Sequence, residues 1–410
     1  MQGWWWTGAL AAALLAGAML VPMLTVRSRA RWWPALAVAV FAILSVRCIL
    51  EIGALTGRTG VTVGAGAIAL GMAGGGYALA AALLAQVRVR VSSPSLPEAT
   101  PGGRIGVALV APVEPAQYRF SLVAEELTDL AEAGVELPPF PVFPLLYAAR
   151  RSGYRKLGAS GASRSAQRIA TRLQSTLNTA DPRFGTVAVA LTEGRPRLTD
   201  VVASLSAHSH DRVIVVSLSP GEAFRSEKAL AELDEARPAA HGIRVQGTDA
   251  SWADEAIPRL VADRVRSLDP CPGPETGIVL LALGRPPEWD RLEPEGARQE
   301  NFVLHRTRAL LIASGHEPDR VVPAYLEWGD PGAAHVVERL AEQGCTKVVL
   351  VPTTMPVDGV TTLVDLQRIA EDARERGLTV LQLPAWGDDP GLAAALCRSV
   401  TQAANEGIRP

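Results

Sequence analysis

The sequence predicts an α/β protein with two similar Rossmann-like lobes, each built on a parallel sheet, preceded by three transmembrane α-helices. Nearly all of the first 86 residues are apolar. Beyond them, short β-branched runs alternate with amphipathic stretches, which is typical of a parallel sheet flanked by helices. Strand ends in the first half of that region also recur, in the same order, in the second half. The repetition predicts two copies of one lobe.

The composition excludes some classes of function. The chain has 410 residues and a net charge of −2, which gives no basic surface for nucleic acid. Its four cysteines, Cys48, Cys271, Cys345 and Cys397, are too far apart in sequence for a metal-ligand motif. We therefore expect no disulfide framework and no structural zinc, and the sequence assigns no certain cofactor.

Three apolar segments, at 4–26, 32–55 and 61–86, have the roughly 20 residues that a membrane-spanning helix needs. They define a predicted membrane domain at 1–90. Arginine is frequent after the first and third segments and rare after the second: Arg27, Arg29, Arg31, Arg88 and Arg90 against Arg58. The positive-inside rule then places the N-terminus outside and the C-terminal domain in the cytoplasm. The expected location is the cell membrane, with the lipid bilayer as a partner.

Two patterns inside these segments have alternative interpretations. Arg47 and Glu51 are four residues apart on one helix, where they could pair with each other. Ala67, Gly71 and Gly75 form a ridge of small residues on the third segment. This ridge either packs the three helices together or forms the face of a homodimer.

A stretch rich in Ser, Pro and Gly at 91–104 predicts a flexible linker, followed by one lobe at 105–270 and a second at 271–410. The predicted strands are Ile105–Ala111, Thr186–Leu191, Arg212–Leu218, Gly277–Leu283, Arg320–Ala324, Lys347–Val351 and Thr379–Leu383. Matching VAVALTEGRP with VVPAYLEWGDP aligns Glu193 with Glu327. Ligands bind at the carboxyl ends of such strands, so we expect a cleft there.

Four stretches in this order resemble the ferrochelatase family, the class II chelatases. They are GYRKLGASGASRSAQRIATRLQ (153–174), DRVIVVSLSP (211–220), LALGRPPEW (281–289) and MPVDGVTTLVDLQ (355–367). The resemblance extends over 105–400. It implies a chelatase-like fold with a cleft for a tetrapyrrole or other planar small molecule, and a divalent metal, iron or another, as substrate.

Metal insertion needs a base for the pyrrole N–H protons and ligands that hand over the metal. By the resemblance, the family's catalytic His and Glu positions hold Leu283 and Thr361 in this chain. Leucine can neither accept a proton nor bind a metal ion, and threonine is a poor substitute in both roles. The chain is thus degenerate at the usual catalytic positions.

Other residues are the candidates for the site. Glu193 and Glu327, at matching strand ends, are candidate catalytic acids, or else caps of the following helices. Asp358 and Asp365 are candidate metal ligands seven residues apart, or else a helix cap and a solvated residue. The candidate ligand-binding residues are Glu114, Arg285, Trp328 and Ser219. His208 and His210 form a further pair, which we interpret as an incidental surface pair rather than a metal site.

Two functions from different classes follow. The first is a membrane-anchored, ferrochelatase-like protein that acts at the cytoplasmic face on a tetrapyrrole or a related metal-binding small molecule. Its reaction as an enzyme would be that of a lyase, metal insertion through an altered site. The alternative is a non-catalytic module that holds a tetrapyrrole or a partner protein at the membrane. The sequence leaves open whether the chain is catalytic.

Overall fold

The computed structural model describes residues 2–25, 32–56, 59–85, 104–111, 113–132, 143–192, 194–207, 210–218, 244–248, 254–268, 273–284 and 294–406. The chain divides into two compact units. The helical unit comprises Met1–Val91 and Gln117–Lys156, and the two-lobed unit comprises Ser92–Ala116 and Leu157–Pro410. Apart from Arg104, the predicted linker lies outside the described residues.

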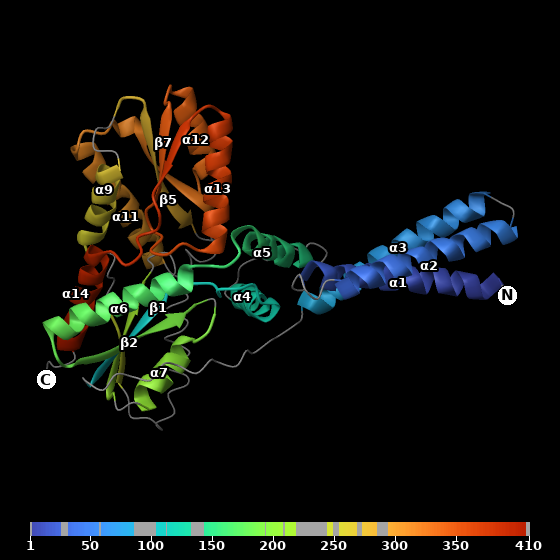
Figure 1. Cartoon of the computed structure of the whole chain (residues 1–410), viewed down its shortest axis with the longest axis horizontal. Helices are drawn as coiled ribbons and strands as arrows, with labels where there is room; N and C mark the ends of the chain where they lie inside the picture. Colours follow the sequence, from blue (N-terminus) through green and yellow to red (C-terminus); the bar gives the residue numbers. More distant parts are fainter. Residues whose placement is uncertain are drawn as a thin grey trace. The chain divides into compact units, whose positions relative to one another are not determined.

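The helical unit begins with three helices, α1 (Gln2–Thr25), α2 (Trp32–Thr56) and α3 (Thr59–Ala85), drawn in blue in Figure 1. Helix α1 packs against both of the others. A side chain at Gly17 would place its Cβ 1.7 Å from the Ala73 carbonyl oxygen, and one at Gly76 would lie 2.0 Å from that of Leu14. The two glycines therefore allow the backbones of α1 and α3 to come into contact.

The ridge of Ala67, Gly71 and Gly75 does not make this contact. All three residues are exposed, and nothing lies within 4 Å of a Cβ built at Gly71 or Gly75. The interpretation that this ridge packs the helices together is wrong, because α3 turns Gly76 toward α1 instead. A homodimer through the ridge stays a prediction. Arg47 and Glu51 are both among the described residues, and they do not form an ion pair with each other there.

The three predicted membrane spans, 4–26, 32–55 and 61–86, are not confirmed. Among the described residues, no helix combines the length and the apolar character needed to cross a membrane. The expectation of a multi-pass protein in the cell membrane is therefore wrong.

Two more helices, α4 (Phe120–Glu132) and α5 (Phe143–Leu157), complete the helical unit although they follow the first strand of the other unit. Phe120 stacks on Tyr147, and Tyr118 contacts Tyr154 edge to face. Burial raises the pKa of Tyr118 to about 12.

Arg151 of α5 donates a hydrogen bond of 3.0 Å to the carbonyl of Met23 in the last turn of α1. A cation is favoured at this end of a helix.

The two-lobed unit holds two parallel sheets with the same strand order. Lobe 1 has the order β2-β1-β3-β4 and lobe 2 the order β6-β5-β7-β8. The strands of lobe 1 are β1 (Ile105–Ala111), β2 (Phe184–Leu191), β3 (Arg212–Ser217) and β4 (Arg244–Gly247). Those of lobe 2 are β5 (Thr276–Gly284), β6 (Val321–Trp328), β7 (Lys347–Pro352) and β8 (Thr379–Gln382). The prediction of two parallel α/β lobes is confirmed, and β4 is the strand that the sequence missed.

The lobes also repeat in detail. Leu191 N–H donates to the carbonyl of Pro196 beyond β2, and Tyr325 N–H donates to that of Pro331 beyond β6. These residues belong to the two stretches that the sequence comparison aligned. The repeat is therefore structural as well as sequential.

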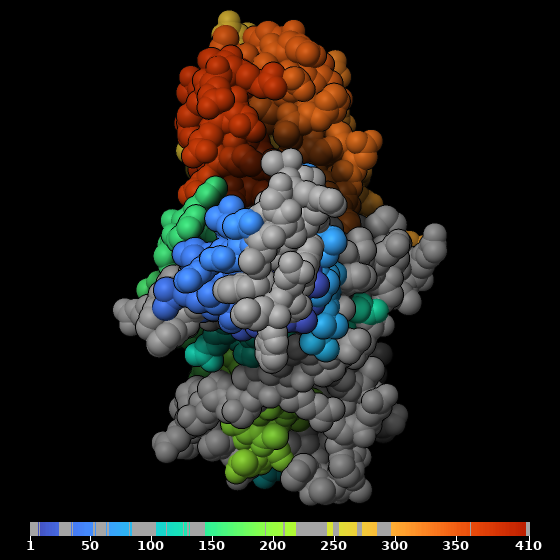
Figure 2. Space-filling model, turned by 90° about the vertical axis from the view of Figure 1, so that its right-hand side faces the viewer, coloured from blue at the N-terminus to red at the C-terminus, as the bar shows by residue number. Residues whose placement is uncertain are grey.

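Helices cover both faces of each sheet. In lobe 1, α6 (Ala162–Ala180) and α7 (Leu198–Ala207) lie on opposite faces. In lobe 2, α12 (Ala333–Glu342) and α13 (Val360–Glu375) lie side by side on one face, orange and red in Figure 2. The other face of lobe 2 carries α9 (Ala256–Leu268) and α11 (Pro294–Ala313). Strands covered on both faces read as continuous apolar runs, as β5 does.

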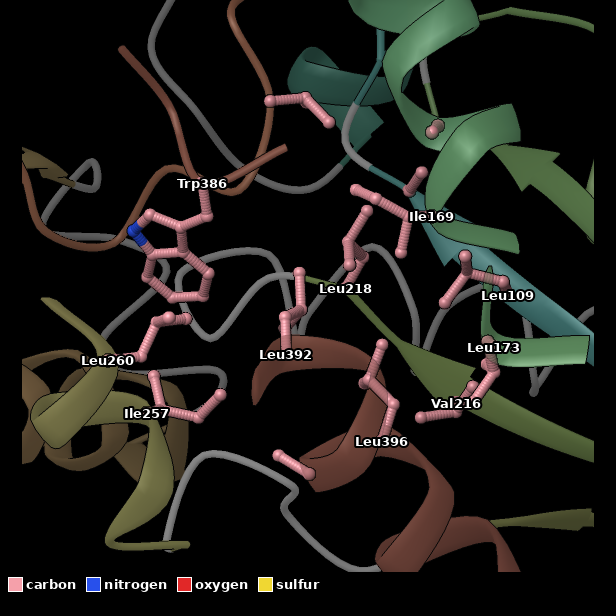
Figure 3. Packing of buried hydrophobic residues seen from close by; sticks show 14 of the residues in the cluster. Leu109, Ile169, Leu173, Val216, Leu218, Ile257, Leu260, Trp386, Leu392 and Leu396 are labelled. Atoms are coloured by element: carbon pink, nitrogen blue, oxygen red, sulfur yellow. The ribbon is translucent and has the colours of Figure 1, made fainter. Parts of the chain in front are cut away.

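The last helix, α14 (Pro390–Glu406), belongs to lobe 2 in sequence but packs against α6 and β3 of lobe 1 as well as α9. Figure 3 shows Leu392 and Leu396 of α14 lying between Ile257 of α9 and Leu173 of α6. All four side chains are buried in one apolar cluster that includes residues of both sheets. Helix α14 therefore gives the two lobes a common core.

A buried arginine of lobe 1 closes the end of α14. Arg212, at the start of β3, donates hydrogen bonds of 2.7 Å to the carbonyls of Ala403 and Ala404. It also donates to Gln246 Oε1 at 2.5 Å. The last carbonyls of a helix have no partner within the helix and carry partial negative charge, so the guanidinium stabilises this end of α14.

Replacing Gly76 by alanine should separate α1 from α3, because the added Cβ would overlap the Leu14 carbonyl. We expect faster amide hydrogen exchange in both helices of the full chain. Gly71→Ala is the matched control on the same helix. It should slow exchange, since alanine favours a helix by about 1 kcal/mol over glycine and meets no neighbour there. Equal behaviour of the two variants would contradict the packing described above.

Arg212→Lys should destabilise the two-lobed unit, because a lysine cannot serve both carbonyls in the geometry of a guanidinium fork. Loss of one charged hydrogen bond costs about 2 kcal/mol of the free energy of unfolding. Pulse proteolysis across a urea series would measure this change. Arg398→Lys is the control, because the ion pair of Arg398 with Asp254 is solvent-exposed and should contribute less than about 1 kcal/mol.

Candidate functional site

The carboxyl edges of the two sheets meet at Glu114. This residue follows β1 in lobe 1, and its Oε1 accepts a hydrogen bond of 2.6 Å from Val360 N–H. Val360 is the first residue of α13, which follows β7 in lobe 2. Ser160 Oγ donates to the same oxygen at 2.7 Å. The strand ends at which the sequence predicted a cleft are therefore brought together.

Glu114 acts here as the cap of α13. The first N–H groups of a helix lack partners and carry partial positive charge, which a carboxylate satisfies. A Cβ at Gly359 would lie 2.9 Å from Glu114 Oε2, so the glycine leaves room for the carboxylate. The alternative that Asp358 caps this helix is wrong. Ligand binding by Glu114 stays a prediction.

Asp358 lies in the loop before α13 rather than on it, so it does not share a helix face with Asp365. Its Oδ1 accepts a hydrogen bond of 3.1 Å from Ala385 N–H. Burial raises the pKa of Asp358, and this N–H and the nearby Arg264 cation oppose that rise. Arg264 itself donates to the carbonyls of Pro384 and Ala385. Asp358 therefore joins the loop before α13 to the one before α14.

Asp365 lies on α13 and its carboxylate is 3.4 Å from the guanidinium of Arg368. Within the described residues, no three acidic, His or Cys side chains are grouped so that they could hold a metal ion. The assignment of Asp358 and Asp365 as metal ligands stays a prediction.

Glu327 and Trp328 occupy the carboxyl end of β6, and both are exposed. The Trp328 side chain is 49% exposed, which leaves the indole accessible to a planar ligand. Gly284, at the end of β5, has a φ of +81°, and a Cβ there would lie 2.8 Å from the Trp328 carbonyl oxygen. Glycine therefore lets β5 run directly against the backbone of Trp328, which fixes its position.

Leu283 packs against the apolar cluster on the α12 and α13 face of lobe 2. Thr361 lies in the first turn of α13. These are the positions that the resemblance equates with the family's catalytic His and Glu, and that equivalence stays a prediction. Glu193, Ser219 and Arg285 lie outside the described residues.

A buried carboxylate that the sequence analysis missed lies beneath the same edge. Glu300 of α11 is only 4% exposed, and its Oε1 accepts a hydrogen bond of 3.2 Å from Thr354 Oγ1, two residues beyond β7. Helical periodicity in the sequence could have identified Glu300 as a buried residue. Glu300 is in helical phase with the buried residues Val303, Leu304 and Leu311, so helical periodicity places it on the apolar face of α11.

His210 is not a surface residue, contrary to the interpretation of the His208 and His210 pair. Its side chain is buried, with Nδ1 2.9 Å from the carbonyl of Leu205 and Nε2 3.4 Å from Thr186 N–H. It joins the end of α7 to β2. His208 lies outside the described residues.

Comparisons with known proteins point to chelatases. Residues 299–403 match the CbiX family. The ferrochelatase of Thermosynechococcus vestitus is 25% identical over 224 residues, covering 51% of this chain and 56% of that protein. The ferrochelatase of a Synechococcus species is 27% identical over 271 residues, covering 60% and 66%. The chain thus spans less than two thirds of the length of these relatives.

The solved structure of SirB from Bacillus subtilis with Fe3+ is 13% identical and has a TM-score of 0.47, covering 74% of this chain and 97% of that one. This likeness is too weak to add to the sheet topology. The sequence matches confirm the resemblance to chelatases.

Asp358→Asn should raise the stability of the chain at neutral pH. Because burial raises the pKa of Asp358, the folded chain holds the proton more tightly than the unfolded chain does. Stability therefore falls as the pH rises from the ordinary range of a carboxyl group through the raised pKa. Asparagine keeps an acceptor for Ala385 N–H without the charge.

Thermal unfolding from pH 3 to pH 7 would test this. The variant should unfold at a higher temperature at pH 7, and the difference should vanish below about pH 3.9, where both forms are neutral. Asp365→Asn is the control and should give no such gain. A less stable Asp358→Asn at pH 7 would mean that attraction to Arg264 outweighs the cost of burial.

Proposed function

Taking the chain as a chelatase-like protein, we propose that it binds a tetrapyrrole between the carboxyl edges of its two sheets and inserts a divalent metal ion. The observation that supports this most directly is the bond from Val360 N–H to Glu114, which brings the two edges together. Exposed acidic and aromatic side chains at the end of β6 supply chemistry suited to a planar ligand.

The reaction sets the requirements for the site. Insertion of a divalent ion into a free-base macrocycle replaces two N–H protons, so two protons must leave. Carboxylates near the ring can accept them. We assign this role to Glu327 and Glu193. Glu300 is a further candidate, because its carboxylate lies under the same edge.

The remaining residues would hold the two substrates. Trp328 offers an indole face on which the macrocycle can stack. Arg285 could bind a carboxylate substituent through both guanidinium arms. Asp358 and Asp365 are hard oxygen donors that could deliver the metal ion, and Ser219 and Glu114 would contact the ligand.

The test is an optical titration of the full chain with a free-base porphyrin, followed by anaerobic addition of ferrous or zinc ion. We expect a Soret shift on binding and then protein-dependent metal insertion. Glu327→Gln should slow insertion by about 10²- to 10⁴-fold without abolishing binding, since general-base catalysis contributes about this much. Trp328→Ala should instead weaken binding by about fivefold, because an aromatic stack contributes roughly 1 kcal/mol.

Glu371→Gln, an exposed acid on α13 away from the strand ends, is the matched control and should change neither quantity. Insertion that is equally fast in Glu327→Gln would remove this residue from the mechanism. No Soret shift in the wild-type chain would refute the tetrapyrrole proposal.

A second candidate, a module that binds a tetrapyrrole or a partner without turnover, is favoured by Leu283. Its side chain packs into the apolar cluster and offers no acceptor for a proton. A Soret shift without any metal insertion would select this function.

A further inference from the structure

Lobe 2 has a cavity of about 360 Å³ beside its edge strand β6. The first residues of β6, the turn before it, α11 and α12 line this cavity. It is near the start of β6, whereas Glu327 and Trp328 lie at the end of that strand. The cavity is therefore separate from the candidate site, and its volume is in the range of small-molecule sites.

Arg308 of α11 is fixed in the cavity wall. Its Nε donates to the carbonyl of Val321 and its Nη2 to that of Pro318, both at 2.8 Å. Among the described residues, no group accepts a hydrogen bond from its Nη1. One arm of a rigid, planar donor thus remains available in a fixed position.

Arg339 of α12 lines the same cavity, and among the residues that the structure describes its side chain has no hydrogen-bond or ion-pair partner. Its Nε is buried and makes no hydrogen bond, and within the described part of the chain no carboxylate pairs with its guanidinium. A buried donor without an acceptor costs about 1 to 3 kcal/mol. The two Nη groups of the same guanidinium also have no hydrogen-bond acceptor among the described residues. An oxyanion in the cavity would bind these two groups, because guanidinium groups bind carboxylate and phosphate oxygens through two parallel hydrogen bonds.

The charges of the lining favour an anion. The lining carries two positive charges, on Arg308 and Arg339, and one negative charge, on Asp319. His305 and Gln343 can add further hydrogen-bond donors. We propose that this cavity binds a small ligand through an oxyanion, either a phosphate or a carboxylate group. Asp319 would weaken such binding by repulsion.

Arg339 could instead have a purely structural role, and that role predicts a different result for anion binding. Arg339 lies in the last turn of α12, where a cation also offsets the partial negative charge of the helix end. That role predicts stabilisation of α12 but no saturable binding of anions, and no effect of Asp319 on such binding.

Equilibrium dialysis of the full chain with labelled inorganic phosphate, and separately with labelled succinate, would test the proposal at constant ionic strength in sodium chloride. We expect one saturable site per chain for at least one probe. Arg339→Gln should weaken binding tenfold or more, and Asp319→Asn should strengthen it several-fold. The probe that binds more tightly tells phosphate from carboxylate recognition.

Arg374→Gln, which removes the same charge from an exposed position on α13, is the matched control and should bind like the wild type. Circular dichroism would show whether Arg339→Gln is folded, and the Asp319→Asn result does not depend on that variant. Saturable binding of neither probe, or equal binding by Arg339→Gln and Arg374→Gln, would overturn the proposal.

Discussion

The packing of α14 against both lobes is the interaction on which the two-lobed unit depends. Each sheet has its own flanking helices. Helix α14 follows the last strand of lobe 2 in sequence, and it buries Leu392 and Leu396 in an apolar cluster that also contains residues of lobe 1. Burying a leucine contributes roughly 1.5 to 3 kcal/mol. Arg212 then binds the last carbonyls of the helix from the lobe 1 side. Separating the lobes would expose these leucines and break both hydrogen bonds from Arg212 to the carbonyls of α14.

This shared core holds the carboxyl edges of the sheets where they can form one site. Glu114 can cap α13 across the boundary between the lobes only while their separation is fixed. Trp386 adds to this by donating its indole N–H to the carbonyl of Pro352, at the end of β7. The strand ends that carry Glu327 and Trp328 therefore belong to a rigid scaffold. Rigid placement of acids and an aromatic face suits both proposed functions.

The helical unit depends on a different constraint, the close approach of two backbones. Gly17 and Gly76 make α1 and α3 touch, whereas Gly71 and Gly75 on the same α3 face outward. Spacing alone does not distinguish Gly76 from Gly71 and Gly75, because all three are small residues on one helix. The difference lies in the rotation of α3 about its axis, which its partner α1 decides.

The sequence by itself determined the elements of the lobes and their repetition. Alternating β-branched and amphipathic runs give strands and helices locally, and the strand at Ile105–Ala111 has the predicted bounds. The sequence also indicated that Glu300 is buried, because Glu300 lies on the same helical face as Val303 and Leu304. Only the tertiary structure decided that Glu114 caps α13, that His210 is buried and that α14 packs on lobe 1. Each of these depends on a contact between residues far apart in the chain, and local periodicity carries no information about which distant surfaces meet.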